Sequence, residues 1–269
     1  MLDSILVQAP VFLLVFVRCF ALMLVLPMFS MRASPRIAKI ALAGYMAFFI
    51  FGNVDFSMYA PYISDDGTFS LHYVLLLIGE GLIGIIIGFY ITIIFAAFSA
   101  AGQFLAFQMG LSAASSYDSL SQVENPLMGQ FFNLVAMLVF MQTKWFQRLF
   151  LKGLVTSFSS ISALSIVQNN EQIVRFMLSG LTNLFKDALV IALPVMGTLV
   201  LITSCTGLLT KAAPQMNLLS EGFPIMILVA FTIIAFVMPQ IIDFFIASFA
   251  QGFADIEKLF TVVSGGGIL

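Results

Sequence analysis

The stretch that decides the fold class spans residues 81–117 and reads GLIGIIIGFYITIIFAAFSAAGQFLAFQMGLSAASSY. It contains no charged residue. About 20 apolar residues are enough for a helix to cross a bilayer, so this run is longer than one straight crossing requires. Its apolar residues show no sustained alternation with polar ones, the pattern that is typical of strands. We therefore predict long apolar helices.

The composition of the whole chain supports the same class of protein. Of the 269 residues, 61% are apolar and 9% are charged, whereas soluble domains carry about 25% charged residues. A soluble surface built from this pool would expose large apolar patches. We predict an all-α, polytopic membrane protein of helical hairpins that forms a single domain over residues 1–269. The further apolar runs are 5–29, 40–54, 125–143, 153–170, 188–210 and 222–242.

These runs differ in length in a way that one bilayer crossing per run does not explain. Some are too short for a comfortable crossing, and residues 81–117 are too long for one straight helix. Helical hairpins that stop partway through the membrane, or helices that bend, explain both extremes. The first run has no basic leader, so we expect a retained helix that is broken or kinked near Pro27.

Several functions are disfavoured by what the sequence lacks. The net charge of −2 comes without a basic run, so there is no electrostatic surface for nucleic acid. One histidine and two cysteines, Cys19 and Cys205, cannot form a zinc or iron–sulfur site unaided, and we expect both cysteines to be buried. We place His72 in an interfacial loop, and no catalytic motif accompanies it. We expect no enzyme activity, no cofactor and no metal.

Two charged residues lie inside the apolar runs. Arg18 is in the middle of the first run, and Glu80 stands where the long uncharged run begins. A charged group at membrane depth is tolerated mainly where it faces protein or water. For Glu80 we leave two interpretations open, a structural ion pair and a role in a polar pathway.

Small residues recur at helical spacing immediately after Glu80. Gly81, Gly84 and Gly88 are separated by three and four residues, which places them on one face of a helix. Small residues on one face let a second helix approach closely. We therefore predict that these three glycines pack against a neighbouring helix.

The segment QMGLSAASSYDSLSQVENP, residues 108–126, is the most informative polar stretch. A long apolar helix gives way here to small and hydroxylated residues and then to an Asn-Pro turn signal. Irregular backbone at membrane depth occurs only where protein buries it or water lines it. The segment is therefore either an ordinary hydrophilic loop or a loop inserted into a pore, where Gly110 permits hinging.

A second polar segment, KAAPQMNLLSEGFP, covers residues 211–224. It separates two apolar runs and contains a proline turn followed by a Gly-Phe-Pro restart. We interpret it as the connector of a helical hairpin, across which Lys211 and Glu221 can pair.

The charges do not fit a simple topology. The basic loop at residues 32–39 belongs in the cytoplasm by the positive-inside rule, and the acidic loop at 55–66 belongs outside. Continued alternation then places the basic residues at 144–152 on the wrong side. Either re-entrant hairpins rescue the count, or the chain does not follow ordinary bilayer topology.

Taken together, these motifs resemble the FliR family of flagellar export-gate proteins, whose injectisome counterpart is SctT. The resemblance covers nearly the whole chain. It rests on Gln108-Met109-Gly110-Leu111 with Asp118 downstream, and on Ala213-Pro214-Gln215-Met216-Asn217 followed by Gly222-Phe223-Pro224. The chain departs from the family at Asp118-Ser119, where many members read Asp-Pro.

The resemblance implies a function as well as a fold. With FliP and FliQ, members form the core of the type III export gate at the flagellar basal body in the bacterial inner membrane. FlhB associates with that core, and unfolded flagellar proteins pass through it. Helices lifted out of the membrane plane by the surrounding ring would explain the topology conflict. The loop matching residues 110–125 acts as a plug in the closed channel.

The resemblance also implies roles for particular residues. The predicted plug residues are Gln108, Met109, Gly110, Leu111, Ser112, Asp118 and Asn125. The predicted assembly hairpin comprises Pro214, Gln215, Met216, Asn217, Gly222 and Pro224. The alternative is a transporter or ion channel that acts alone, with Asp187 and Asp243 as pathway charges and Pro194 as a helix break.

Overall fold

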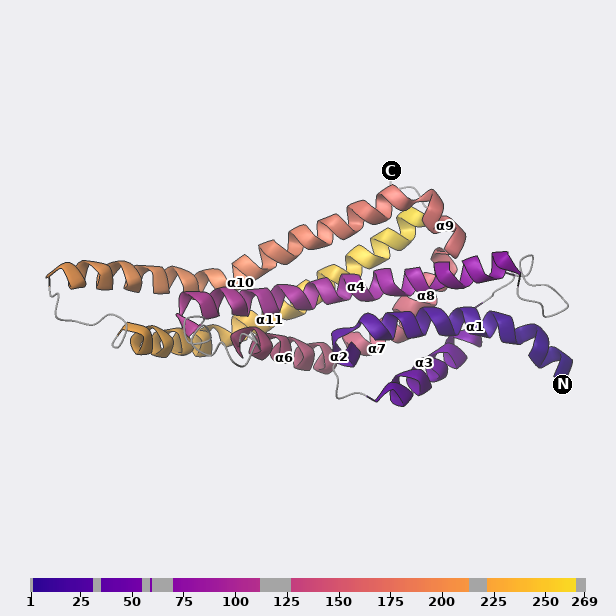
Figure 1. Cartoon of the computed structure of the whole chain (residues 1–269), viewed down its shortest axis with the longest axis horizontal. Helices are drawn as coiled ribbons and strands as arrows, with labels where there is room; N and C mark the ends of the chain where they lie inside the picture. The colour runs from indigo at the N-terminus through magenta and orange to yellow at the C-terminus, as the bar shows by residue number, and fades with distance from the viewer. Residues whose placement is uncertain are drawn as a thin grey trace. The chain divides into compact units, whose positions relative to one another are not determined.

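The computed structural model describes residues 2–30, 35–54, 59, 70–111, 127–212 and 222–264. Within these ranges the chain is helical and contains no β-strand, which confirms the all-α prediction (Figure 1). In chain order the helices are α1 (Leu2–Val25), α2 (Pro27–Ser30), α3 (Arg36–Phe51), α4 (Leu71–Gln108), α6 (Leu127–Gln142), α7 (Trp145–Arg148), the π-helix η2 (Leu149–Gly153), α8 (Leu154–Ser160), α9 (Ala163–Gln168), α10 (Asn170–Ala212) and α11 (Phe223–Val263).

Several helix boundaries differ from the ends of the apolar runs: α10 begins at Asn170 and α11 continues to Val263, whereas the corresponding runs cover 188–210 and 222–242. Helix α4 begins at Leu71, so His72 lies in a helix and is exposed, and its predicted place in a loop is wrong. The apolar run 153–170 contains both α8 and α9, because a new helix starts after Ser162. Its side chain and that of Ser165 form a reciprocal capping box at the start of α9. The expected break near Pro27 is present, since α1 ends at Val25 and α2 begins at Pro27.

The described residues group into two compact units, each discontinuous in sequence. Unit 1 comprises residues 1–93, 144–180 and 250–269, and unit 2 comprises residues 94–143 and 181–249. Helices α4, α10 and α11 each contribute one part to each unit.

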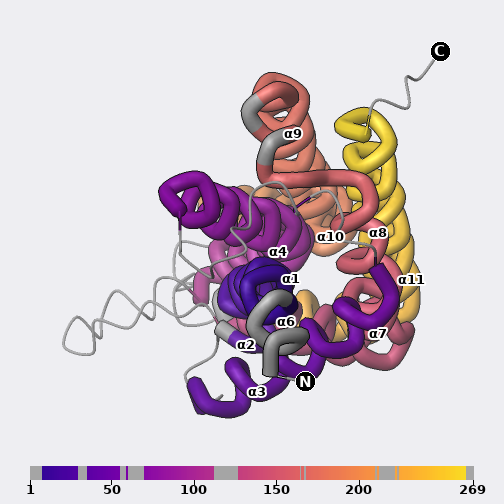
Figure 2. The backbone as a smooth tube through the Cα atoms, turned by 90° about the vertical axis from the view of Figure 1, so that its right-hand side faces the viewer, coloured from indigo at the N-terminus to yellow at the C-terminus, as the bar shows by residue number. Residues whose placement is uncertain are grey.

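In unit 1, α1 lies between α3 and the N-terminal part of α4 (Figures 1 and 2). Helix packing here is close because α4 presents glycine to the backbone of α1. A small buried cluster joins α1 and α4 to Tyr59 and to the start of α9. Its members are Leu14, Tyr59, Tyr73, Leu76 and Ala163.

Unit 2 has an aromatic core. Six buried phenylalanines from α4, α6 and α11 contact one another at centroid separations between 4.0 and 6.3 Å: Phe95, Phe98, Phe132, Phe140, Phe245 and Phe249. Edge-on and tilted contacts of this kind add to the apolar burial of the rings. Within the same unit, α10 and α11 are joined by a hydrogen bond of 2.6 Å from the Ser248 hydroxyl to Asp187 Oδ2.

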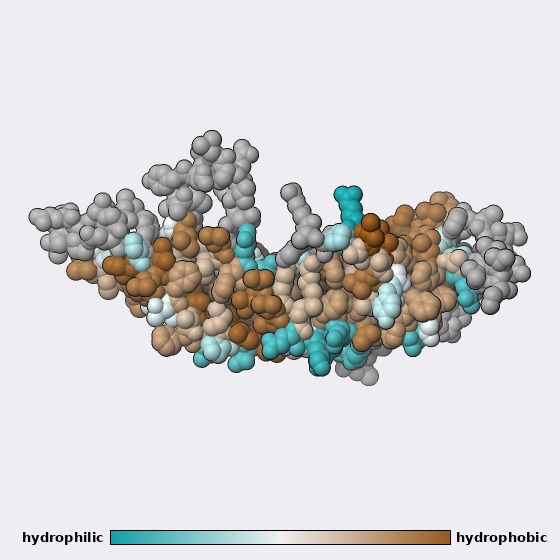
Figure 3. Space-filling model, turned by 90° about the horizontal axis from the view of Figure 1, so that it is seen from below, coloured by the Kyte–Doolittle hydropathy of each residue, from teal (hydrophilic) through white to brown (hydrophobic). Residues whose placement is uncertain are grey.

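Within the described residues, four helical segments are long and apolar enough to cross a membrane: Gln8–Val25, Leu71–Gln108, Asn170–Leu209 and Pro224–Val263. Many of their apolar side chains face outward, and hydrophobic residues predominate among the coloured residues on the face drawn in Figure 3. Cys205 on α10 is exposed, so its predicted burial is wrong, whereas Cys19 on α1 is buried as predicted. The residues around Cys205 are exposed as well, because this part of α10 has little packed against it.

Candidate functional site

The most polar contact in the core of unit 1 joins Arg18 of α1 to Glu80 of α4. Both side chains are completely buried. Arg18 Nε donates to Glu80 Oε2 at 2.6 Å, and Arg18 Nη2 lies 2.5 Å from the same oxygen. Hydrogen bonds between two charged groups are shorter and stronger than neutral ones. The two charges found in apolar runs of the sequence are therefore partners of each other.

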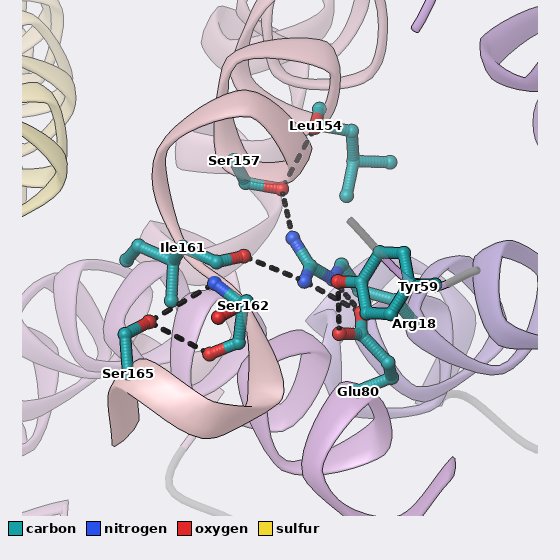
Figure 4. Close-up of polar contacts among 8 residues, drawn as sticks. All are labelled: Arg18, Tyr59, Glu80, Leu154, Ser157, Ile161, Ser162 and Ser165. Carbon is teal, nitrogen blue, oxygen red and sulfur yellow. Dashed lines mark hydrogen bonds and ion pairs between the residues drawn. The ribbon is translucent and has the colours of Figure 1, made fainter. Parts of the chain in front are cut away.

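The other donors of Arg18 reach the segment around the end of α8 (Figure 4). Nη1 donates to Ser157 Oγ at 3.0 Å, and Nη2 donates to the backbone carbonyl of Ile161 at 2.9 Å. The Ser157 hydroxyl in turn donates to the carbonyl of Leu154 at 2.7 Å. The guanidinium also stacks on Phe158, with Cζ 3.9 Å from the ring centroid. One buried cation thus joins α1, α4 and α8.

Glu80 has a second donor, the phenol of Tyr59, which precedes α4 in the chain. Tyr59 Oη donates to Glu80 Oε1 at 2.7 Å, and the tyrosine is buried. Burial, and then the negative charge of Glu80, raise the pKa of the Tyr59 phenol above its ordinary value. Tyr59 therefore remains protonated and can continue to donate to Glu80.

This arrangement bears on the two interpretations of Glu80. Each carboxylate oxygen accepts from a protein group, and no buried side-chain nitrogen or oxygen in the described part of the chain lacks a partner. A relay or ion pathway needs water or a free group beside the carboxylate. The geometry therefore favours the structural ion pair. Among the described residues there is also no cluster of three or more side chains able to hold a metal ion.

The three glycines after Glu80 all face α1, but at different distances. A Cβ at Gly84 would lie 2.3 Å from the backbone oxygen of Arg18, and one at Gly88 would lie 3.0 Å from that of Leu22. At Gly81 the nearest atom is a side-chain carbon of Val17 at 3.4 Å, which is ordinary contact. The backbones of α1 and α4 thus meet at Gly84.

Four of the predicted plug residues lie within the described part of the chain. Helix α4 ends at Gln108, and the buried Met109 continues its hydrogen bonding, with its N–H donating to the carbonyl of Leu105 at 2.9 Å. Gly110 then takes a φ of 77°, a left-handed conformation that glycine adopts without strain. Leu111 follows. Ser112, Asp118 and Asn125 lie outside the described residues.

A close approach between α4 and α6 flanks this segment and was not predicted from the sequence. A Cβ at Gly102 would lie 2.4 Å from the backbone oxygen of Met128 and 2.7 Å from Cα of Gly129. A Cβ at Gly129 would lie 3.0 Å from the backbone oxygen of Ser99. The only available signal was glycine within apolar runs on both sides of the polar segment, and glycine alone does not identify its partner.

The predicted assembly hairpin is described only at its C-terminal end. Gly222 is buried, and Pro224 is exposed in the first turn of α11. Pro214, Gln215, Met216 and Asn217 lie outside the described residues, as does Glu221, the expected partner of Lys211.

Comparison with known proteins identifies the family. The family model described as "Bacterial export proteins, family 1" matches residues 9–252. The flagellar biosynthetic protein FliR of Bacillus subtilis (strain 168) is 32% identical over 89% of this chain and 90% of its own length. FliR of Escherichia coli (strain K12) is 30% identical over 84% of both chains. The surface presentation of antigens protein SpaR of Shigella sonnei is 32% identical over 71% of both chains.

The family model covers the two polar segments, 108–126 and 211–224. It also covers the Arg18–Glu80 ion pair and the glycine contacts of α4. The names of these relatives refer to flagellar biosynthesis and to the surface presentation of antigens, and the family description refers to bacterial export. The chain therefore belongs to family 1 of the bacterial export proteins, the family of the flagellar biosynthetic protein FliR.

Proposed function

We propose that the chain is a structural, channel-forming subunit of the type III export gate at the flagellar basal body in the bacterial inner membrane. In this proposal it assembles with FliP, FliQ and FlhB-like proteins and passes unfolded flagellar proteins. It acts by shape and gating and performs no catalysis. Family membership supports the proposal, and the exposure of its long apolar helices carries it.

Helix α10 exposes apolar side chains over a greater length than a bilayer covers. Its large exposed hydrophobic residues extend from Val174 to Leu209, about 50 Å along an α-helix at 1.5 Å per residue. The hydrocarbon core is about 30 Å thick. A straight helix would need a tilt of about 55° to place all of them in lipid, beyond the range of about 0–40° found for membrane helices. We infer that other subunits cover the remainder.

Helix α11 supports the same inference. Within one apolar 18-residue window of each helix, 17% of the residues are buried in Pro224–Val263 and 28% in Asn170–Leu209. A chain that works alone buries its polar pathway inside its own helix bundle. In these two windows, most residues are instead partly or fully exposed, so they are available for contact with lipid or with neighbours.

The proposed plug is the segment from Gly110 to Asn125. Three observations support it: its small and hydroxylated residues, the left-handed Gly110 at its start, and the close contact of Gly102 with Met128 that holds α4 and α6 together on either side of it. In this proposal the segment closes the resting channel and moves aside for substrate.

Deleting residues 110–125 is expected to open the assembled gate. We expect the complex of the variant with FliP and FliQ to conduct ions at least tenfold more than the native complex in planar bilayers. A chain lacking only residues 265–269 serves as the control and should conduct like the native protein. Native conductance in a correctly assembled deletion complex would refute the plug.

The hairpin connector is expected to matter for assembly. Pro214 and Asn217 both disfavour a continuing helix. The double substitution Pro214→Ala and Asn217→Ala should therefore let the helix extend and reduce co-purification with FliP and FliQ at least fivefold. Met216→Leu, in the same connector, keeps the turn residues and should assemble normally. Equal recovery of both variants would remove this role.

The alternative is a transporter or channel that acts alone, with Pro194 as a helix break and Asp187 as a pathway charge. Neither residue behaves as that alternative expects. Helix α10 continues through Pro194 without ending, and Asp187 is held by Ser248. The two functions differ in an easily measured property. A lone transporter, solubilised without partners, should be monodisperse and bind a solute, whereas a gate subunit should be monodisperse only when co-expressed with FliP and FliQ.

A further inference from the structure

The buried cation of α1 has partners that lie far apart in the chain. Glu80, Ser157 and the carbonyl of Ile161 follow Arg18 by 62, 139 and 143 residues. They belong to α4, to α8 and to the turn before α9, all within unit 1. When α1 contacts only α4, Arg18 Nη1 lacks its acceptor Ser157 Oγ, and Nη2 lacks the carbonyl of Ile161. Arg18 is fully satisfied only when all three segments are in place.

Apolar contacts alone cannot make the docking of α1 depend on the presence of α4, α8 and the turn before α9. Lipid tails are as apolar as leucine, so an apolar helix face is satisfied by lipid almost as well as by another helix. A buried charge is different, because it is tolerated in an apolar environment only when it is paired and hydrogen-bonded. The contact between Arg18 and Glu80 therefore distinguishes a docked α1 from an undocked one, whereas the surrounding leucines do so only weakly.

The other polar contacts between α1 and α4 involve neutral groups, and one of them is the hydrogen bond of 2.8 Å that Tyr73 Oη donates to the carbonyl of Pro10. Thr92 Oγ1 donates to the carbonyl of Val25 at 3.0 Å, but it also has the carbonyl of Gly88 in its own helix at 2.9 Å. Losing the contact with α1 leaves this hydroxyl with a partner. Among the described residues the donors to Glu80 are Tyr59 at Oε1 and Arg18 at Oε2, so the loss of α1 leaves Oε2 without its donor.

We propose that Arg18, Glu80, Ser157, Tyr59 and the Ile161 carbonyl form a charge lock that makes the docking of α1 all-or-none. Helix α1 is retained in the bundle when both α4 and the end of α8 are in place, and it is released when either charge is lost. The inference is independent of the proposed export function. It predicts that removing one of the two charges weakens the docking of α1 more than removing both does, because the remaining charge then stays buried without its partner.

The chain contains a native reporter for this docking. Cys19 is adjacent to Arg18 and completely buried, whereas Cys205, the second of the two cysteines, is exposed. In a full-length Cys205→Ser background, the labelling rate of Cys19 by pyrene maleimide, which partitions into the detergent micelle, measures how often α1 leaves the bundle. The single tryptophan, Trp145, stacks on Phe253 at 4.7 Å within unit 1 and reports separately whether the rest of that unit is intact.

We expect Glu80→Gln and Arg18→Met each to accelerate Cys19 labelling at least tenfold, with native Trp145 fluorescence. The double variant Arg18→Met, Glu80→Met carries no buried charge and should label within threefold of the native rate. Thr92→Val, which removes a neutral hydrogen bond between the same two helices, is the matched control and should also remain within threefold.

Two results would overturn the lock. One is native labelling rates in both single variants, and the other is a double variant that labels as fast as the singles, which would assign the effect to packing. If a single variant yields no folded protein, the double variant decides the question. Recovery of a folded double variant with native Trp145 fluorescence supports the lock, and failure to recover it contradicts the lock.

Discussion

Gly84→Ala is expected to destabilise the chain by about 3 kcal/mol, whereas Gly81→Ala, on the same helix, is expected to be neutral or stabilising. A methyl group added at Gly84 would lie 2.3 Å from the backbone oxygen of Arg18 and 3.1 Å from the backbone nitrogen of Leu22. Neither atom can move without moving α1. The substitution therefore separates two helices and disturbs the buried ion pair beside them.

Gly81 is a nearly ideal control for this effect. The two glycines share a helix and a neighbour, and alanine favours a helix interior over glycine by about 0.8–1.0 kcal/mol at either position. At Gly81 the new methyl group meets only a Val17 side-chain carbon at 3.4 Å. The difference between the two variants therefore isolates the backbone contact at Gly84.

Thermal unfolding of the full-length protein in detergent, followed by circular dichroism, measures both variants. Gly88→Ala should fall between them, because its methyl group would lie 3.0 Å from the backbone oxygen of Leu22. Equal melting temperatures for Gly81→Ala and Gly84→Ala would show that α1 and α4 do not meet at Gly84.

Gly102→Ala is expected to have the second large effect, a loss of about 2–3 kcal/mol together with a leaking gate. Its methyl group would lie 2.4 Å from the backbone oxygen and 2.6 Å from the carbonyl carbon of Met128. Helices α4 and α6 must therefore move apart in unit 2. Because the proposed plug joins these two helices, their separation should also loosen the closed state.

Gly197 on α10 provides the control for Gly102. It also belongs to unit 2, and nothing lies within 4 Å of a Cβ added there. Gly197→Ala should therefore gain helix propensity and keep the native melting temperature or exceed it. Conductance of the assembled gate tests the functional part. A Gly102→Ala complex that melts lower but stays as tightly closed as the native one would separate this helix contact from gating.

Arg18 shows what the sequence can and cannot determine about a buried charge. The sequence required a partner for Arg18 and for Glu80, because charges in apolar runs are costly when they are unpaired. It did not indicate that each was the partner of the other. Ser157 and the Ile161 carbonyl lie more than a hundred positions away from Arg18, as their separations of 139 and 143 residues record, and serine and isoleucine carry no signal of such a role.

The glycines show the same division. The spacing of Gly81, Gly84 and Gly88 predicted one helix face, but it could not rank them, since the rank depends on where the α1 backbone crosses α4. Gly102 and Gly129 carried no periodic signal, yet they make the closest approach in unit 2 among the described glycines. His72 was placed in a loop because apolar content does not reveal where a serine starts a helix, and at α4 the N–H of Tyr73 donates to Ser70 Oγ at 3.2 Å.

What the sequence determined by itself was the class of protein and its family. A chain with 61% apolar and 9% charged residues must exclude water from long helices, and the order of its motifs is specific to one export family. What only the tertiary structure decided was which surfaces exclude that water and which charges meet. Composition and periodicity are properties of single segments, whereas the pairing of Arg18 with Glu80 and the contact at Gly84 depend on how helices distant in sequence cross in space.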